Sequence, residues 1–115
     1  MAFEQAALAM TGAITDLRRV RAETPVEIRC SAPDRELLLV DWLNAIAFEM
    51  STRRLIFGRY DVTLGDSHLA GTAWGEPVDV DRHQPVVEVK GATCTALSVS
   101  RGADGVWHAR CVIDV

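Results

Sequence analysis

The chain has 115 residues, of which 49% are hydrophobic and 24% are charged, a composition typical of a globular domain with its own core. Its net charge of -4 argues against a protein that holds nucleic acid mainly by neutralising phosphates, and suits a protein partner or cations. No apolar run approaches the ~20 residues that span a bilayer, and the start MAFEQAALAM lacks the basic region of a signal peptide. We therefore expect one domain over residues 1–115, in the cytoplasm, without membrane contact or strong direct binding of nucleic acid.

The first predicted element is a helix from Phe3 to Leu17. Its apolar residues recur at helical spacing on one face: Phe3, Ala6, Ala7, Met10, Ala13, Ile14 and Leu17. Nothing before the helix would form a strand or a cap, so we expect that the domain has lost its first element.

A second helix is predicted from Arg35 to Met50. Ser31 and Asp34 form a start that resembles a capping box, and Pro33 fits a first turn. The apolar residues of this helix cover almost its whole circumference. Because the segment is too short and too charged for a membrane, we expect protein to cover it on more than one side.

The remaining segments are rich in Val and Thr and alternate between apolar and polar residues, which is typical of strands. They are TPVEIRC (24–30), RYDVTL, SHLAGTAWG (67–75), VVEVKGATCTALSVS (86–100) and VWHARCVIDV (106–115), with a turn over residues 101–105. Two helices and at least five strands predict an α+β fold, in which the two helices pack against antiparallel sheets on both sides.

The three cysteines, Cys30, Cys94 and Cys111, are widely spaced and form no CxxC pair. We interpret them as reduced core thiols, because a zinc site requires closer pairs. No arrangement suggests nucleophilic catalysis either, since Ser67 and Ser98 lie in neither an elbow nor a triad motif. We therefore expect that the protein is not an enzyme.

The densest polar stretch runs from residue 75 to residue 93. Asp79, Asp81, Arg82 and His83 follow the end of a predicted strand, where functional residues often gather. The alternative is a solvated loop with a local Asp–Arg pair. Further along, Glu88 and Lys90 are two residues apart and share one face of a strand, so they form either a surface cross-strand pair or part of a site.

The chain ends on CVIDV, which places the Asp114 carboxylate one residue from the α-carboxylate of Val115. Two like charges this close repel each other unless a cation or hydrogen-bond donors neutralise them. Hard oxygen ligands favour Ca²⁺, Mg²⁺ or Mn²⁺. The alternative is that the two carboxylates are simply solvated.

Four stretches resemble the archease family, in the same order and over essentially the whole chain. They are AFEQAALAMTGAITDL, LLVDWLNAIAFEM, GEPVDVDRHQPVVEVKGAT and VWHARCVIDV. The most specific signals are DWLN in the second helix, the G-E-P-x-D-x-x-R-H loop, the E-V-K-x-x-T strand, and the ending on Ile-Asp and a hydrophobic residue.

The resemblance implies a small α+β domain that is an accessory protein of an RtcB-type RNA ligase, the enzyme that joins tRNA halves in tRNA splicing and repairs RNA ends with GTP. Such a protein promotes guanylylation and turnover of the ligase and is not itself a ligase. The resemblance also implies a divalent metal site (Ca²⁺, Mg²⁺ or Mn²⁺), to which Asp114 and the carboxylate of Val115 correspond. Our candidate residues for the surface that faces the ligase are Asp79, Arg82, His83, Glu88 and Lys90.

The sequence departs from the family pattern in two places. Family members begin with a strand that carries an H-T-A-D-like motif, whose Asp would be the third metal ligand, and this strand is absent here. Either the start codon is assigned too late, or the strand has been removed, or the chain is a divergent form, and we favour the first two alternatives. After E-V-K, the family Tyr-His pair is replaced by Cys94-Thr95. The alternative function is a chaperone-like module that binds proteins without a metal.

Overall fold

The computed structural model describes residues 2–83, 91–101 and 107–114, and the last two ranges are described as backbone. In chain order the elements are α1 (Ala2–Ile14), the 3-10 helix η1 (Leu17–Arg19), β1 (Thr24–Ser31), α2 (Arg35–Arg53), β2 (Leu55–Leu64), β3 (His68–Pro77), α3 (Val80–His83), β4 (Gly91–Arg101) and β5 (Trp107–Asp114).

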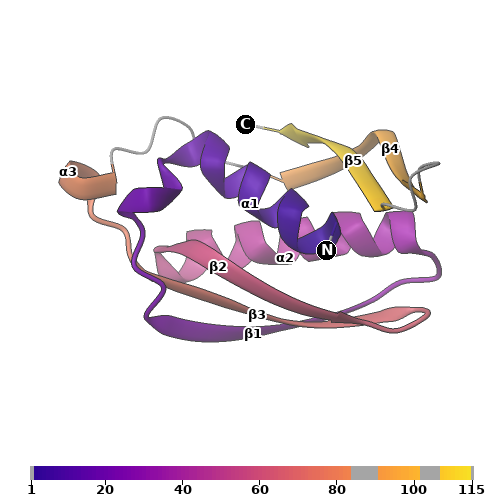
Figure 1. Cartoon of the computed structure of the whole chain (residues 1–115), viewed down its shortest axis with the longest axis horizontal. Coiled ribbons are helices and arrows are strands. Elements are labelled where there is room, and N and C mark those ends of the chain that lie inside the picture. The colour runs from indigo at the N-terminus through magenta and orange to yellow at the C-terminus, as the bar shows by residue number, and fades with distance from the viewer. Residues whose placement is uncertain (1, 84–90, 102–106, 115) are drawn as a thin grey trace.

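The two long helices lie between two antiparallel sheets (Figure 1). One sheet has three strands in the order β1-β3-β2, and the other is formed by β4 and β5. Helix α2 packs against all three strands of the first sheet and against β4, whereas α1 packs against β2 and β5. This arrangement confirms the predicted α+β fold with sheets on both sides of the helices.

Helix α1 ends at Ile14, three residues earlier than predicted. The side chain of Asp16 accepts a hydrogen bond from the Arg18 backbone N–H and so begins η1, which turns the chain towards β1. The buried residues of α1 are Phe3, Ala7, Met10, Thr11 and Ile14. The apolar spacing predicted all of them except Thr11, but Ala13, which it placed on the same face, is exposed.

Helix α2 begins with Asp34 as its N-cap, whose side chain accepts a 2.8 Å hydrogen bond from the Leu37 backbone N–H. The prediction that Ser31 begins the helix was wrong, because Ser31 is the last residue of β1. The helix continues to Arg53 and ends where Arg54 adopts a left-handed conformation with φ 53°. The three-stranded sheet and the β4–β5 pair cover two sides of α2. Phe48 of this helix nevertheless remains 64% exposed.

The three-stranded sheet turns one face towards the helices. Along β3, the buried residues Leu69, Gly71 and Ala73 alternate with more exposed ones. Gly71 lies directly against Trp42, and a Cβ at this position would come within 2.8 Å of the indole ring. The glycine therefore allows α2 to approach the sheet. Strand β2 begins at Leu55, earlier than predicted, and has a bulge between Phe57 and Arg59.

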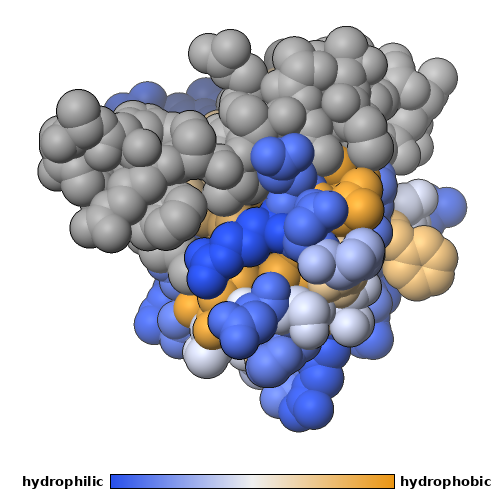
Figure 2. All heavy atoms as spheres, turned by 90° about the vertical axis from the view of Figure 1, so that its right-hand side faces the viewer, coloured by the Kyte–Doolittle hydropathy of each residue, from blue (hydrophilic) through white to orange (hydrophobic). Residues whose placement is uncertain are grey.

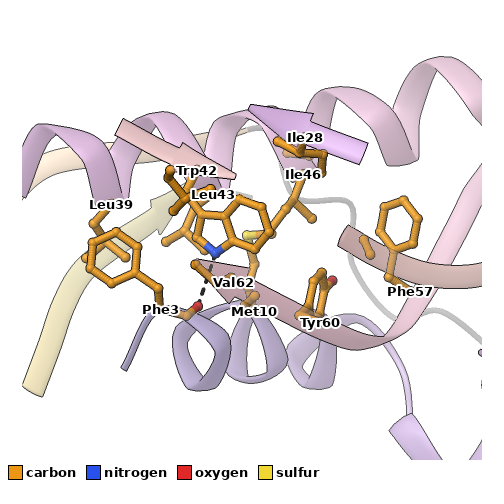
Figure 3. Packing of buried hydrophobic residues seen from close by; sticks show 14 of the residues in the cluster. Phe3, Met10, Ile28, Leu39, Trp42, Leu43, Ile46, Phe57, Tyr60 and Val62 are labelled. Atoms are coloured by element: carbon orange, nitrogen blue, oxygen red, sulfur yellow. Dashed lines mark hydrogen bonds between the residues drawn. The ribbon is translucent and has the colours of Figure 1, made fainter. Parts of the chain in front are cut away.

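Trp42 lies at the centre of the core and is 0% exposed (Figure 3). Its indole N–H donates a 3.1 Å hydrogen bond to the backbone oxygen of Phe3, which joins α2 to the start of α1. Its ring also meets the Tyr60 ring edge to face, with the centroids 6.0 Å apart. The Tyr60 hydroxyl bonds to Thr11 Oγ1 at 2.6 Å, and burial raises the pKa of Tyr60 above its usual range. The core therefore joins α1, α2 and β2.

Strands β4 and β5 form the predicted antiparallel pair. Their pairing runs from Gly91 opposite Asp114 to Arg101 opposite Trp107, with an irregularity between Thr93 and Ser98. Residues 84–90 and 102–106 lie outside the described residues, and with them the first part of the strand predicted over 86–100 and the predicted turn.

The surface that faces the viewer in Figure 2 is mostly hydrophilic where it is described, with hydrophobic side chains exposed in small areas between. Among the described residues, no helix is both long enough and apolar enough to cross a membrane.

Candidate functional site

The two predicted carboxylate ligands lie at the end of β5. Asp114 is the last residue of this strand, and Val115 lies outside the described residues. The backbone of Asp114 is paired with that of Gly91, the first residue of β4. In the sequence Gly91 directly follows Lys90, the last residue of the E-V-K stretch, which itself lies outside the described residues. The pairing of Gly91 with Asp114 was not predicted from the sequence.

Among the side chains that the structure describes, no three His, Cys, Asp or Glu residues are grouped so that they could hold a metal ion. The side chain of Asp114 is not among them. The predicted ligand set therefore rests on donor chemistry and register. Two hard oxygen groups on adjacent residues, at the end of a paired strand, fit a divalent cation such as Ca²⁺, Mg²⁺ or Mn²⁺.

The stretch from Glu76 to His83 forms a compact corner where β3 ends. Strand β3 ends at Pro77, and the one-turn helix α3 follows. The Val78 backbone N–H donates to the backbone oxygen of Arg54 at 2.9 Å, which fixes the corner to the end of α2. The Asp79 side chain accepts a 3.1 Å hydrogen bond from the Asp81 N–H. The strand predicted over residues 67–75 therefore continues two residues further, to Pro77.

His83 points into this corner and is only 1% exposed. Its Nδ1 accepts a 2.9 Å hydrogen bond from the Asp79 backbone N–H, so Nδ1 carries no proton. Its Nε2 lies 2.6 Å from Glu76 Oε1, and therefore Nε2–H donates to this carboxylate. The Thr15 hydroxyl donates to the backbone oxygen of His83. His83 thus joins α1, β3 and α3 as a neutral imidazole.

The prediction that His83 faces a partner was therefore wrong. Its ring is buried, and both ring nitrogens have hydrogen-bond partners inside the protein, as buried polar groups require. Asp79 is exposed, as a residue facing a partner must be. The side chain of Arg82 and the whole of Glu88 and Lys90 lie outside the described residues, so these three remain predictions.

Sequence reasoning missed Glu76 and Thr15, the two residues that hold His83. Glu76 is 4% exposed even though the alternation along β3 makes Gly75 its inward residue. The chain therefore breaks its alternation at the last two positions of the strand. Thr15 is 68 residues away from His83 in the sequence. It is only 5% exposed, but no pattern in the sequence predicts its burial. Only the tertiary fold brings these residues together.

Comparisons with known proteins agree on one family. The model of the archease protein family (MTH1598/TM1083) matches residues 1–115. The protein archease of Pyrococcus furiosus is 32% identical over 118 aligned residues, which cover 99% of this chain and 83% of the relative. The protein archease of Methanopyrus kandleri is 37% identical and covers 96% of this chain and 81% of the relative. The solution structure of Methanobacterium thermoautotrophicum protein 1598 matches with a TM-score of 0.81 at 32% identity, covering 99% of this chain and 83% of the other.

Proposed function

The chain belongs to the archease family, and on this premise we propose that it is an accessory protein of an RtcB-type RNA ligase that promotes the GTP-dependent guanylylation and turnover of this enzyme. The observation that carries the proposal is the family match over residues 1–115, which includes both the G-E-P-x-D-x-x-R-H corner and the Ile-Asp ending. The protein would act in tRNA splicing and RNA repair without joining RNA itself.

The proposal includes a divalent metal held by the Asp114 carboxylate and the α-carboxylate of Val115. Support comes from donor chemistry, because two adjacent carboxylates repel each other unless a cation neutralises them. It also comes from the backbone pairing of Asp114 with Gly91, which holds the end of β5 in place. When bound, the metal would supply positive charge for the phosphate chemistry of the ligase. The chain's own role would be to present the two carboxylate groups of Asp114 and Val115 to the metal.

The test is a guanylylation assay of the cognate ligase with GTP, in the presence and absence of the chain. We expect the chain to raise both the rate of guanylylation and the number of turnovers. If the chain does not accelerate guanylylation at any concentration, the accessory role is disproved.

The Asp114→Asn variant tests the metal site independently of the accessory role. It removes one negative oxygen ligand at nearly constant size, and we expect it to abolish most of the stimulation. Asp61→Asn is the matched control, because Asp61 is an exposed aspartate on β2. Full stimulation by Asp114→Asn would eliminate the metal site and leave the accessory role intact.

A second readout measures the metal without the ligase. Calorimetric titration of Ca²⁺, Mg²⁺ and Mn²⁺ into the chain alone should show binding that Asp114→Asn weakens at least tenfold. A two-glycine extension after Val115 should weaken it as well, since the terminal carboxylate moves away. If aggregation of unrelated proteins were suppressed equally with and without chelator, and equally by Asp114→Asn, the chaperone-like alternative would replace the ligase proposal.

A further inference from the structure

An aromatic side chain and an arginine stack on the outward face of the three-stranded sheet. Trp74 lies between Pro25 of β1 and Arg59 of β2 in the strand register. The Arg59 guanidinium carbon lies 4.5 Å from the centroid of the Trp74 ring. Arg59 and Pro25 are exposed, and Trp74 is partly exposed. The stack is therefore accessible from outside the molecule.

Two further arginines lie at the same end of the sheet. Arg54 follows α2, and its backbone oxygen accepts the hydrogen bond from Val78, just beyond the end of β3. Arg21 precedes Glu23, whose backbone N–H donates to the Gly75 oxygen beside Trp74. Figure 1 shows that the start of β1, the end of α2 and the end of β3 lie together at one end of the molecule. We call Arg21, Arg54, Arg59 and Trp74 the Trp74 patch.

The arginines of the Trp74 patch differ from their neighbours in charge pairing. Arg18 forms an ion pair with Asp16 and Arg53 forms one with Glu49. Within the described part of the chain, Arg21, Arg54 and Arg59 form no ion pair with a carboxylate, and all three are exposed. Among the described residues, these three positive charges therefore have no carboxylate partner.

We propose that the Trp74 patch binds single-stranded nucleic acid, with its arginines on phosphates and with a base stacked on the Arg59–Trp74 pair. Guanidinium groups bind phosphate oxygens in a fork geometry, and bases stack on aromatic rings and on guanidinium planes. An acidic peptide would satisfy the arginines but would leave the stack unused. The patch combines both features, which favours a polynucleotide. The inference goes beyond the accessory role and does not depend on it.

Acidic residues limit the extent of the site. Along the sheet, the next outward-facing row places Glu27 and Asp61 on either side of Thr72. Glu23, Asp79 and Asp81 are exposed at the end of the sheet itself. Because all these carboxylates repel phosphates, the contact should be confined to a few nucleotides around the Arg59–Trp74 stack. The net charge of -4 acts in the same direction and limits binding to a weak, salt-sensitive contact.

Fluorescence anisotropy of labelled oligo(U) and oligo(dT) of equal length tests the proposal on the chain alone. We expect dissociation constants of about 1–100 µM at 50 mM salt. With three phosphate contacts on a single strand, affinity should fall about 20-fold between 50 and 200 mM salt. Binding to either oligonucleotide supports the site, and tighter binding to one of them indicates whether the site prefers RNA or DNA.

Arg59→Gln and Trp74→Ala should each weaken binding about tenfold, because each removes one side of the stack. Arg29→Gln is the matched control, since Arg29 is an exposed arginine opposite Ala70, beyond the acidic row of the same sheet. We expect it to change affinity less than twofold. No binding at 50 mM salt, equal losses with Arg29→Gln, or equal competition by polyglutamate would overturn the proposal, and the last result would indicate an acidic protein partner.

Discussion

Two polar groups lie near the end of β3, and they are organised in opposite ways. The His83 corner is buried, and both imidazole nitrogens and the backbone oxygen bond to groups of the same chain. The Trp74 patch is on the surface, and three of its members are cations without a carboxylate partner among the described residues. In the corner, His83 bonds to Glu76 and Asp79, which are close to it in sequence, and to Thr15, which is not. The groups left for a ligand come from separate strands and loops.

The largest effect should come from breaking the buried corner. His83→Ala removes a donor from the Glu76 carboxylate, an acceptor from the Asp79 N–H, and packing between three elements. We expect a loss of roughly 3 kcal/mol in unfolding free energy, since a buried polar partner is left behind. Urea unfolding followed by tryptophan fluorescence measures it. A loss below about 1 kcal/mol would show that the corner does not stabilise the fold.

Two conservative variants sharpen this result. In His83→Asn the side-chain oxygen keeps the acceptor for the Asp79 N–H, whereas in His83→Gln the terminal amide keeps the donor for Glu76. Both should be less destabilising than His83→Ala. If all three variants lose the same stability, packing rather than hydrogen bonding holds the corner.

The difference between the two groups also shows what the sequence could predict. Helical spacing of apolar residues predicted α1 and α2, and alternation of apolar and polar residues predicted the strands, because each pattern repeats over many residues. The burial of His83 was not predicted, because its two partners cannot be recognised in the sequence. Thr15 follows the end of α1, and Glu76 occupies a position of β3 where the alternation of buried and exposed residues fails. The Arg59–Trp74 stack depends on a register that shifts at the bulge beside Gly58. No local pattern specifies that shift.

Thr15→Val should have the next largest effect. The change keeps the size of the side chain but removes the hydroxyl that donates to the buried oxygen of His83. We expect a loss of about 2 kcal/mol, the cost of an unsatisfied buried acceptor. Because Thr15 and His83 belong to one hydrogen-bond group, the double variant with His83→Ala should lose less than the sum of the two losses. Strict additivity in urea unfolding would contradict the coupling between α1 and α3.

Tyr60 extends the comparison to a buried group that titrates. Burial raises its pKa above the ordinary value of 10.0, so the unfolded chain loses its phenolic proton first as pH rises. The stability contribution is complete below pH 10 and falls above it, by about 1.4 kcal/mol at pH 11. Tyr60 is the single tyrosine of the chain, so absorbance at the tyrosinate band reports it alone. A folded-state midpoint near pH 10 would show that Tyr60 is accessible to water.

The smallest effect on stability is expected at the exposed group. Arg59→Gln removes a cation from a surface stack and leaves the core untouched, so unfolding free energy should change by less than about 0.5 kcal/mol. The same variant is expected to weaken oligonucleotide binding about tenfold, which His83→Asn should not do. A stability loss as large as that of His83→Ala would mean that the Arg59–Trp74 stack holds the bulged end of β2 in place. In that case the two groups would both serve the fold, and the distinction between a buried structural corner and an exposed binding patch would fail.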